Sequence, residues 1–129
     1  MIVASNAGAR SRGGRLLMAV GALLFAFWTA SAVAAESPAE IAGHIAAGHA
    51  YDKHVVAERQ FPGIASRAAF ATRIQGIIEH PTAFRPLSSG RTAYWDAASG
   101  AVVIVNPHDR DGGTCFKPRA GRAYFDNLH

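Results

Sequence analysis

The sequence contains three equally spaced histidines that could take part in chemistry: His44, His49 and His54. Imidazole serves as a general acid or base near neutral pH because its ordinary pKa is about 6.5. On an α-helix a spacing of five residues turns each side chain by about 140°, so the three rings cannot share one face. The sequence also lacks His-Glu-x-x-His and Cys-x-x-Cys spacings. We therefore expect no metal ion and no cofactor, and we expect His44 on the exposed side of a helix.

The stretch from His49 to Glu58 could carry acid–base chemistry. His49 and Lys53 are four residues apart and lie on one helical stripe, with His54 beside Lys53. Glu58 follows His54 by one turn, where its carboxylate could orient the imidazole ring. An ammonium group beside imidazoles can hold an anionic oxygen. A solvated polar helix face has the same composition, and spacing alone does not separate the two interpretations.

A predicted strand at residues 91–96 carries an arginine and two aromatic side chains. Strand alternation places Arg91 and Trp95 on one face, whereas Tyr94 lies on the other together with Thr92. A guanidinium on a sheet surface suits a phosphate or a carboxylate, or is simply a surface charge. Trp95 is expected to pack in the core.

Two glycines, Gly112 and Gly113, precede a further predicted strand that begins at Thr114. Such a turn can bring backbone N–H groups and the Thr114 hydroxyl close to an anion, although turn formation alone also explains the glycines. Cys115 alternates to the opposite side of the strand and is expected to be buried and unreactive. As the only cysteine of the chain it can form no internal disulfide.

Two helices are predicted to hold these segments in place. Residues 37–40 (Ser-Pro-Ala-Glu) combine a capping serine, a first-turn proline and the glutamate of a capping box. A first helix is expected from there to about Arg59, weakened in its first half by two glycines. Phe-Pro-Gly at 61–63 breaks it, and Ser66 caps a second helix that ends at His-Pro, residues 80–81. An apolar stripe on that second helix faces a core: Phe70, Ile74, Ile77 and Ile78.

Short strands and turns are predicted after Pro81. The expected strands are residues 83–88, 91–96, 101–105 and 114–117, and residues 123–125 add a strand or a short turn. Pro86 makes the first an edge strand, and apolar residues on both faces make the third a central one. Two N-terminal helices packed on a three- to four-stranded antiparallel sheet define an α+β domain.

The first 34 residues have the three parts of a secretory signal peptide. Three arginines precede an uncharged run from Leu16 to Ala35, which ends in small residues. Ala-Val-Ala at 32–34 is the expected recognition site, with cleavage before Ala35. Cleavage would leave one domain, residues 35–129, that is periplasmic or secreted. The alternative is an uncleaved membrane anchor, because twenty uncharged residues are just long enough to span a bilayer.

The net charge of the predicted mature domain is small. The chain carries a formal charge of +4, but three arginines and no acidic residue lie in the signal, so ten basic and nine acidic residues remain. Bulk charge therefore does not argue for nucleic-acid binding. From Arg85 onward six basic residues face four acidic ones, which is compatible with a local basic face.

Several runs resemble the C-terminal toxin domains of bacterial contact-dependent and polymorphic toxin systems. They are GHAYDKHV at 48–55, FPG at 61–63, GRTAYWD at 90–96, DGGTCFKP at 111–118 and GRAYF at 121–125. The resemblance covers residues 48–128. The nearest general class is that of the metal-independent ribonucleases grouped as the barnase–EndoU–colicin–RelE fold, in which N-terminal helices pack on an antiparallel sheet.

This resemblance implies that the domain cleaves RNA. The 2′-hydroxyl of RNA would attack the adjacent phosphate, giving a cyclic phosphate and a free 5′-hydroxyl. His49 or His54 would act as general base, and a second group would protonate the leaving oxygen. Lys53 and Arg91 would stabilise the charged phosphorane, and Thr114 would bond a phosphate oxygen. Further substrate contacts are assigned to Tyr94, Phe116, Lys117 and Arg119.

The expected partners are an RNA substrate and a cognate immunity protein, and the mature domain is expected to be a monomer without stable membrane insertion. Two other functions are compatible with the sequence: a non-enzymatic exported binding module of the cell envelope, and an exported hydrolase of another anionic or cell-wall substrate. A ribonuclease requires His49 or His54, Lys53, Arg91 and Thr114 to meet at one cleft, whereas a binding module does not.

Overall fold

The computed structural model describes Ala32 and residues 34–129. The predicted signal peptide and its alternative, a membrane anchor, lie almost entirely outside the described residues. Among the helices of the described part, none is long and apolar enough to cross a membrane.

Two helices begin at the serine caps that the sequence predicts. Helix α1 (Pro38–Ala47) starts with a complete capping box, in which the main-chain N–H of Ser37 donates to Glu40 Oε2 at 2.8 Å. Helix α2 (Arg67–Glu79) starts at Ser66, whose Oγ accepts the N–H of Ala69 at 3.1 Å. Of its predicted apolar stripe, Phe70, Ile74 and Ile77 are buried, and Ile78 is partly buried against the same cluster.

The prediction of one continuous helix to Arg59 is wrong. Helix α1 ends at Gly48, whose backbone is extended (φ −86°, ψ −164°), and a π-helix, η1 (Tyr51–Ala57), follows. The wide turn continues past the last helical residue, since the N–H of Glu58 donates to the carbonyl of Lys53, five residues back, at 2.8 Å. A Cβ at position 48 would lie 2.6 Å from the Cβ of Asp111, so glycine is the residue that permits this close approach.

Four antiparallel strands form the sheet in the order β1-β2-β3-β4. They are β1 (Ala83–Pro86), β2 (Thr92–Asp96), β3 (Ala101–Val105) and β4 (Gly113–Phe116), with a 3₁₀ turn, η2 (Ser88–Gly90), between the first two. The predicted edge position of the first strand and the central position of the third are both confirmed. Strand β3 is buried on both faces, because its side chains alternate between two apolar clusters.

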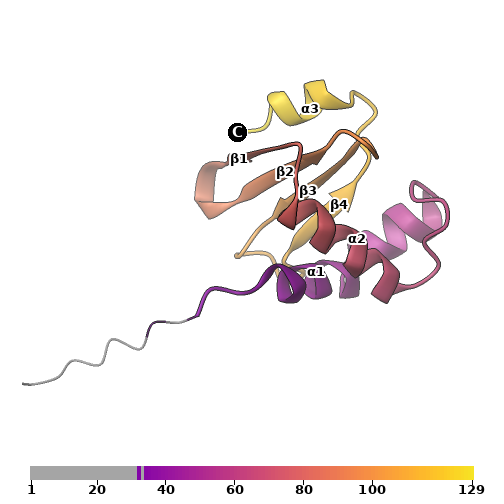
Figure 1. The fold of residues 1–129 in the computed structure, drawn as a ribbon, viewed down its shortest axis with the longest axis horizontal. Helices are drawn as coiled ribbons and strands as arrows, with labels where there is room; N and C mark the ends of the chain where they lie inside the picture. The colour runs from indigo at the N-terminus through magenta and orange to yellow at the C-terminus, as the bar shows by residue number, and fades with distance from the viewer. Residues whose placement is uncertain (1–31, 33) are drawn as a thin grey trace, which may run out of the picture. The chain divides into compact units, whose positions relative to one another are not determined.

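Helices cover both faces of the sheet (Figure 1). Residues of α1, η1 and α2 pack with Val103 and Cys115 in one cluster, and the predicted α+β class is confirmed. The other cluster joins Trp95 and Ile104 to Phe125 of α3 (Arg122–Asp126). This short helix stands where a last strand or turn was predicted, because Phe125 fills the face that the N-terminal helices leave open.

Candidate functional site

A cavity of about 540 Å³ lies on the α3 side of the sheet, beside β4 and η1. Its floor is formed by side chains of β3 and β4, and its walls by η1 and by the loops at both ends of β4. The lining residues are His49, Lys53, His54, Glu58, Gln60, Arg91, Ile104, Asn106, Asp109, Gly113, Thr114, Phe116, Lys117, Pro118 and Arg119.

Most of the residues singled out in the sequence line this one cavity. It joins the five proposed catalytic residues to three of the four proposed substrate contacts, Phe116, Lys117 and Arg119. The fourth, Tyr94, does not line it. Tyr94 packs on the sheet face that α1 and α2 cover, opposite to the α3 side, and stacks on Phe84 with 6.3 Å between ring centroids. Alternation along β2 and β4 therefore keeps Tyr94 away from Thr114.

The imidazole of His54 is buried and held by two neighbouring side chains. Its side chain is buried, with 8% exposed, and its Nδ1 lies 2.8 Å from Glu58 Oε2. The ring also stacks on Phe116 at a centroid distance of 5.2 Å. Because an ionised carboxylate only accepts hydrogen bonds, Nδ1 carries the proton and Nε2 of the neutral ring has the free lone pair.

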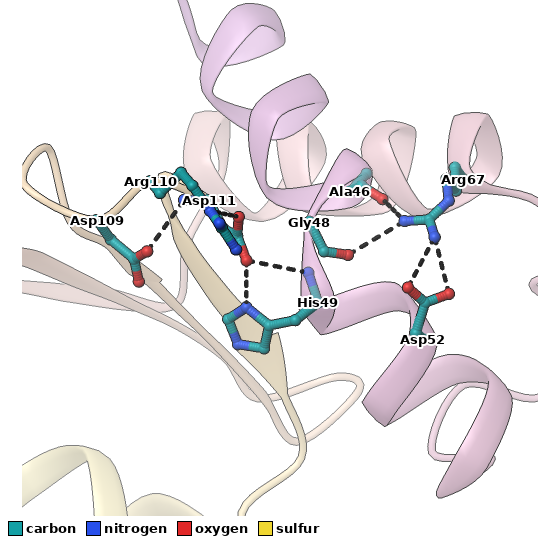
Figure 2. Close-up of polar contacts among 8 residues, drawn as sticks. All are labelled: Ala46, Gly48, His49, Asp52, Arg67, Asp109, Arg110 and Asp111. Carbon is teal, nitrogen blue, oxygen red and sulfur yellow. Dashed lines mark hydrogen bonds and ion pairs between the residues drawn. The ribbon is translucent and has the colours of Figure 1, made fainter.

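His49 has a carboxylate partner of its own, which Figure 2 shows. Asp111 Oδ2 lies 2.7 Å from His49 Nδ1 and also accepts the main-chain N–H of His49 at 3.3 Å. These two hydrogen bonds, the side-chain one first, lower the pKa of Asp111 below its usual value of 3.8. As in the pair of His54 and Glu58, the carboxylate fixes which nitrogen carries the proton. Sequence reasoning missed Asp111, because 62 residues separate the partners.

Arg67 fixes the bend that carries His49 (Figure 2). Its guanidinium donates to the carbonyls of Ala46 and Gly48, at 2.9 and 3.1 Å, where α1 ends and leaves carbonyls without helical partners. It also forms a two-pronged ion pair with Asp52, at 2.7 and 2.8 Å. The first turn of α2 is thereby tied to the start of η1. No sequence signal identified this arginine.

His54 lies inside the π-helix η1, and His49 lies two residues before it. A helix with hydrogen bonds between residues five apart is wider than an α-helix, so residues five apart come closer to one face. The separation of about 140° applies to an unbroken α-helix, which the chain does not form here, and both side chains line the cavity. His44 precedes the bend, has a side chain 63% exposed and lies away from the cavity, as predicted.

The hydroxyl of Thr114 lies just beneath the cavity surface. Its Oγ1 is buried and has no hydrogen-bond partner among the described residues. A buried hydroxyl without a partner costs about 1–3 kcal/mol. A phosphate oxygen that reached Oγ1 after a small shift of the covering side chains would satisfy it. Cys115, on the other face of β4, is buried, and burial raises the pKa of its thiol to about 12, which leaves it protonated and inert.

Four cations line the cavity together with the two histidines: Lys53, Arg91, Lys117 and Arg119. Two carboxylates, Glu58 and Asp109, also line the cavity, which leaves a positive balance. Arg91 is held by Ser88 Oγ at 3.1 Å and by the main-chain oxygen of His129 at 2.7 Å. Across the described residues, no group of three or more histidine, cysteine or acidic side chains is placed to hold a metal ion.

The Asp111 pair predicts a specific pH dependence of stability. Because the folded state lowers the pKa of Asp111, its ionised form stabilises the fold fully above about pH 4, and this contribution disappears as pH falls through the lowered value. The substitution Asp111→Asn removes this pH-dependent contribution to stability. Urea unfolding at several pH values should show that the wild-type advantage over the variant shrinks below about pH 4. Parallel pH profiles of the two proteins would contradict the pairing.

Comparisons with known proteins assign the chain to no family: no family model matches it, and no curated protein is significantly similar in sequence. The chemistry of the cavity therefore has to be inferred from its own geometry.

Proposed function

We propose that this protein is an exported, toxin-like endoribonuclease that cleaves RNA without a metal ion. The observation that carries the proposal is the pairing of His49 with Asp111 and of His54 with Glu58 at one cation-lined cavity. Of two oriented imidazoles, one can act as general base and the other as general acid. RNA cleavage requires both, because one proton leaves the RNA and another is added to it.

The reaction uses the nucleophile that RNA itself supplies. One histidine takes the proton of the 2′-hydroxyl, whose oxygen attacks the adjacent phosphorus. The bond from phosphorus to the 5′-oxygen breaks, and the other histidine, in its charged form, donates a proton to that oxygen. The products are a 2′,3′-cyclic phosphate and a 5′-hydroxyl. Lys53 and Arg91, which line the same cavity, would offset the negative charge of the phosphorane.

The direct test is a cleavage assay on the purified full chain. Total RNA and a defined single-stranded RNA are incubated in EDTA between about pH 5 and pH 8, where histidine titrates. We expect cleavage that leaves cyclic phosphate ends, and no cleavage of an oligonucleotide with a 2′-deoxy sugar at the cut site. A folded protein that cleaves no RNA would instead favour the non-enzymatic binding module.

Export and an immunity partner belong to the same proposal. The basic stretch, apolar run and Ala-x-Ala site at residues 1–34 support export. A ribonuclease made by the cell that must survive it requires a protein that neutralises it, and the positive cavity suits an acidic partner surface.

Thr114→Val separates the catalytic role of the hydroxyl from its effect on stability. The substitution removes a buried donor without a partner and keeps the shape, so the free energy of unfolding should stay equal or rise by about 1 kcal/mol. The rate of RNA cleavage should fall by about 100-fold, because the phosphorane has one donor fewer. Thermal unfolding and initial rates measure the two effects.

The matched control for this substitution is Thr92→Val, a threonine on β2 that does not line the cavity. It should leave the cleavage rate unchanged. A Thr114→Val protein with wild-type activity would contradict any contact between this hydroxyl and the phosphate.

A further inference from the structure

We infer that the cavity takes a single-stranded RNA segment with at least two phosphates, one at the histidines and a second at Lys117 and Arg119. This inference rests on the proposed ribonuclease function. It adds that a phosphate next to the cleaved one is a specific part of the substrate.

The sheet register places the cations at opposite ends of the cavity. Thr92 pairs with Val105 and Val105 with Gly113, so Arg91 lies at the end of the sheet where β4 begins. Lys117 and Arg119 follow the other end of β4. Residues 113–116 span about 10 Å at the usual rise per strand residue.

Arg91 therefore enters the cavity from one end of β4, and Lys117 and Arg119 enter it from the other, so a phosphate bound by Arg91 leaves the second pair to a neighbouring phosphate. A stacked single strand rises about 3.4 Å per phosphate, and an extended one rises more. His49 pairs with Asp111 before β4, whereas His54 stacks on Phe116, next to Lys117. A scissile phosphate between the two rings therefore lies between Arg91 and the Lys117 end, and the next phosphate along the strand can reach Lys117 and Arg119.

Hydrogen bonds fix the main chain of the segment that carries Lys117 and Arg119. The main-chain N–H of Lys117 donates to Gln60 Oε1 at 2.9 Å, and the N–H of Gly121 closes a turn on the carbonyl of Pro118 at 3.0 Å. The Lys117 ammonium lies 5.2 Å from the centre of the buried Phe61 ring. Neither cation forms an ion pair with a carboxylate of the described residues, so both charges are available to an anion.

The burial of His54 restricts the substrate to a single strand. With 8% of its side chain exposed, its ring can be reached only by a phosphate that enters the cavity. A strand separated from its partner can bend inward in this way, as the loops and ends of RNA do in most specific complexes.

The test compares short substrates that differ by one phosphate. A dinucleotide is offered with no terminal phosphate, with a 5′-phosphate or with a 3′-phosphate, and kcat/KM is measured for the full chain. We expect one of the two added phosphates to raise kcat/KM by roughly ten-fold or more, the effect of a charge-assisted hydrogen bond. The end that produces the gain identifies the direction in which the strand lies.

The double variant Lys117→Ala, Arg119→Ala should abolish this gain. Its kcat/KM for longer RNA should also depend less on salt, by about 0.7 in the slope of log kcat/KM against log salt for each phosphate that the variant no longer binds. Arg122→Ala is the matched control, because Arg122 is an exposed cation that pairs with Asp126 outside the cavity. That control should keep both the gain and the salt slope.

The outcomes separate this inference from the proposed function. Cleavage of the dinucleotide that is indifferent to either terminal phosphate would overturn the second phosphate site and leave the ribonuclease intact. A full gain retained by the folded double variant would overturn the assignment to Lys117 and Arg119. Failure to cleave any RNA, long or short, would overturn the ribonuclease and this inference together.

Discussion

Replacing His54 by asparagine is expected to lower kcat/KM for RNA by about 1,000-fold. A positioned general acid or base contributes about 100- to 10,000-fold, and His54 is the more buried of the two paired histidines. Asparagine can still donate a hydrogen bond to Glu58, but it can neither accept nor release a proton near neutral pH. Initial rates on a defined single-stranded RNA, with circular dichroism to verify folding, measure the effect.

His44→Asn is the matched control for this substitution. His44 lies five residues before His49, as His49 lies before His54, yet it stands on α1 away from the cavity. The control should cleave RNA at the wild-type rate. Equal decreases in kcat/KM for the His44 and His54 variants would mean that the histidines act through overall charge. Wild-type kcat/KM in a folded His54 variant would mean that His54 takes no part in the mechanism.

The variant of His49 distinguishes the roles of the two rings. A general base and a general acid give a bell-shaped dependence of kcat/KM on pH, with one limb for each group. His49→Asn should lower the rate and abolish one limb. If the limb at low pH disappears, His49 is the general base, and if the limb at high pH disappears, it is the general acid.

The local features of the fold could be predicted because their causes lie within a few residues. The capping box at Ser37 and the cap at Ser66 involve residues three apart, and the buried stripe of α2 follows the helical repeat. Strand alternation likewise placed Trp95 in the core and Cys115 opposite Thr114. The same alternation put Tyr94 on the face opposite Arg91, which already argued against a shared site.

The bend before His49 could not be predicted, because its causes lie far along the chain. Gly48 admits Asp111 from the loop before β4, and Arg67 from α2 satisfies the carbonyls at the bend. In the sequence alone, Gly48 indicates only a weak point in an otherwise continuous helix. An α-helical repeat applied across it separates His49 from His54, whereas in the structure, where η1 begins at Tyr51, both line one cavity.

The helix α3 shows a second limit of local patterns. Residues 121–125 contain Gly-Arg-Ala-Tyr-Phe, and adjacent aromatic residues are common in strands. The segment becomes helical because the sheet face that carries Trp95 needs a cover, and a single turn places Phe125 against it, 6.2 Å from the Trp95 ring centroid. Tertiary packing decides the outcome here.

Gly113→Ala is expected to destabilise the fold by about 3–5 kcal/mol. Gly113 has φ +134°, a conformation that L side chains rarely adopt, and a Cβ there would lie 1.9 Å from the carbonyl oxygen of Ile104. Backbone strain of about 1–3 kcal/mol adds to a similar cost of overpacking. Because β3 and β4 must separate to relieve the clash, the cavity floor at Thr114 should move as well. Thermal unfolding should show a decrease in Tm of about 15–30 °C.

Gly43→Ala is the control with the opposite sign. Gly43 lies inside α1, and a Cβ built on it meets nothing within 4 Å. Alanine at this exposed helical position should stabilise the fold by about 0.5–1 kcal/mol, because glycine loses more conformational entropy in a helix. The two substitutions add the same methyl group, so opposite shifts in Tm would show that the approach of β4 to β3, rather than glycine content, limits stability at position 113. An unchanged Tm for Gly113→Ala would mean that β4 does not pair with β3 in the register that forms the cavity floor.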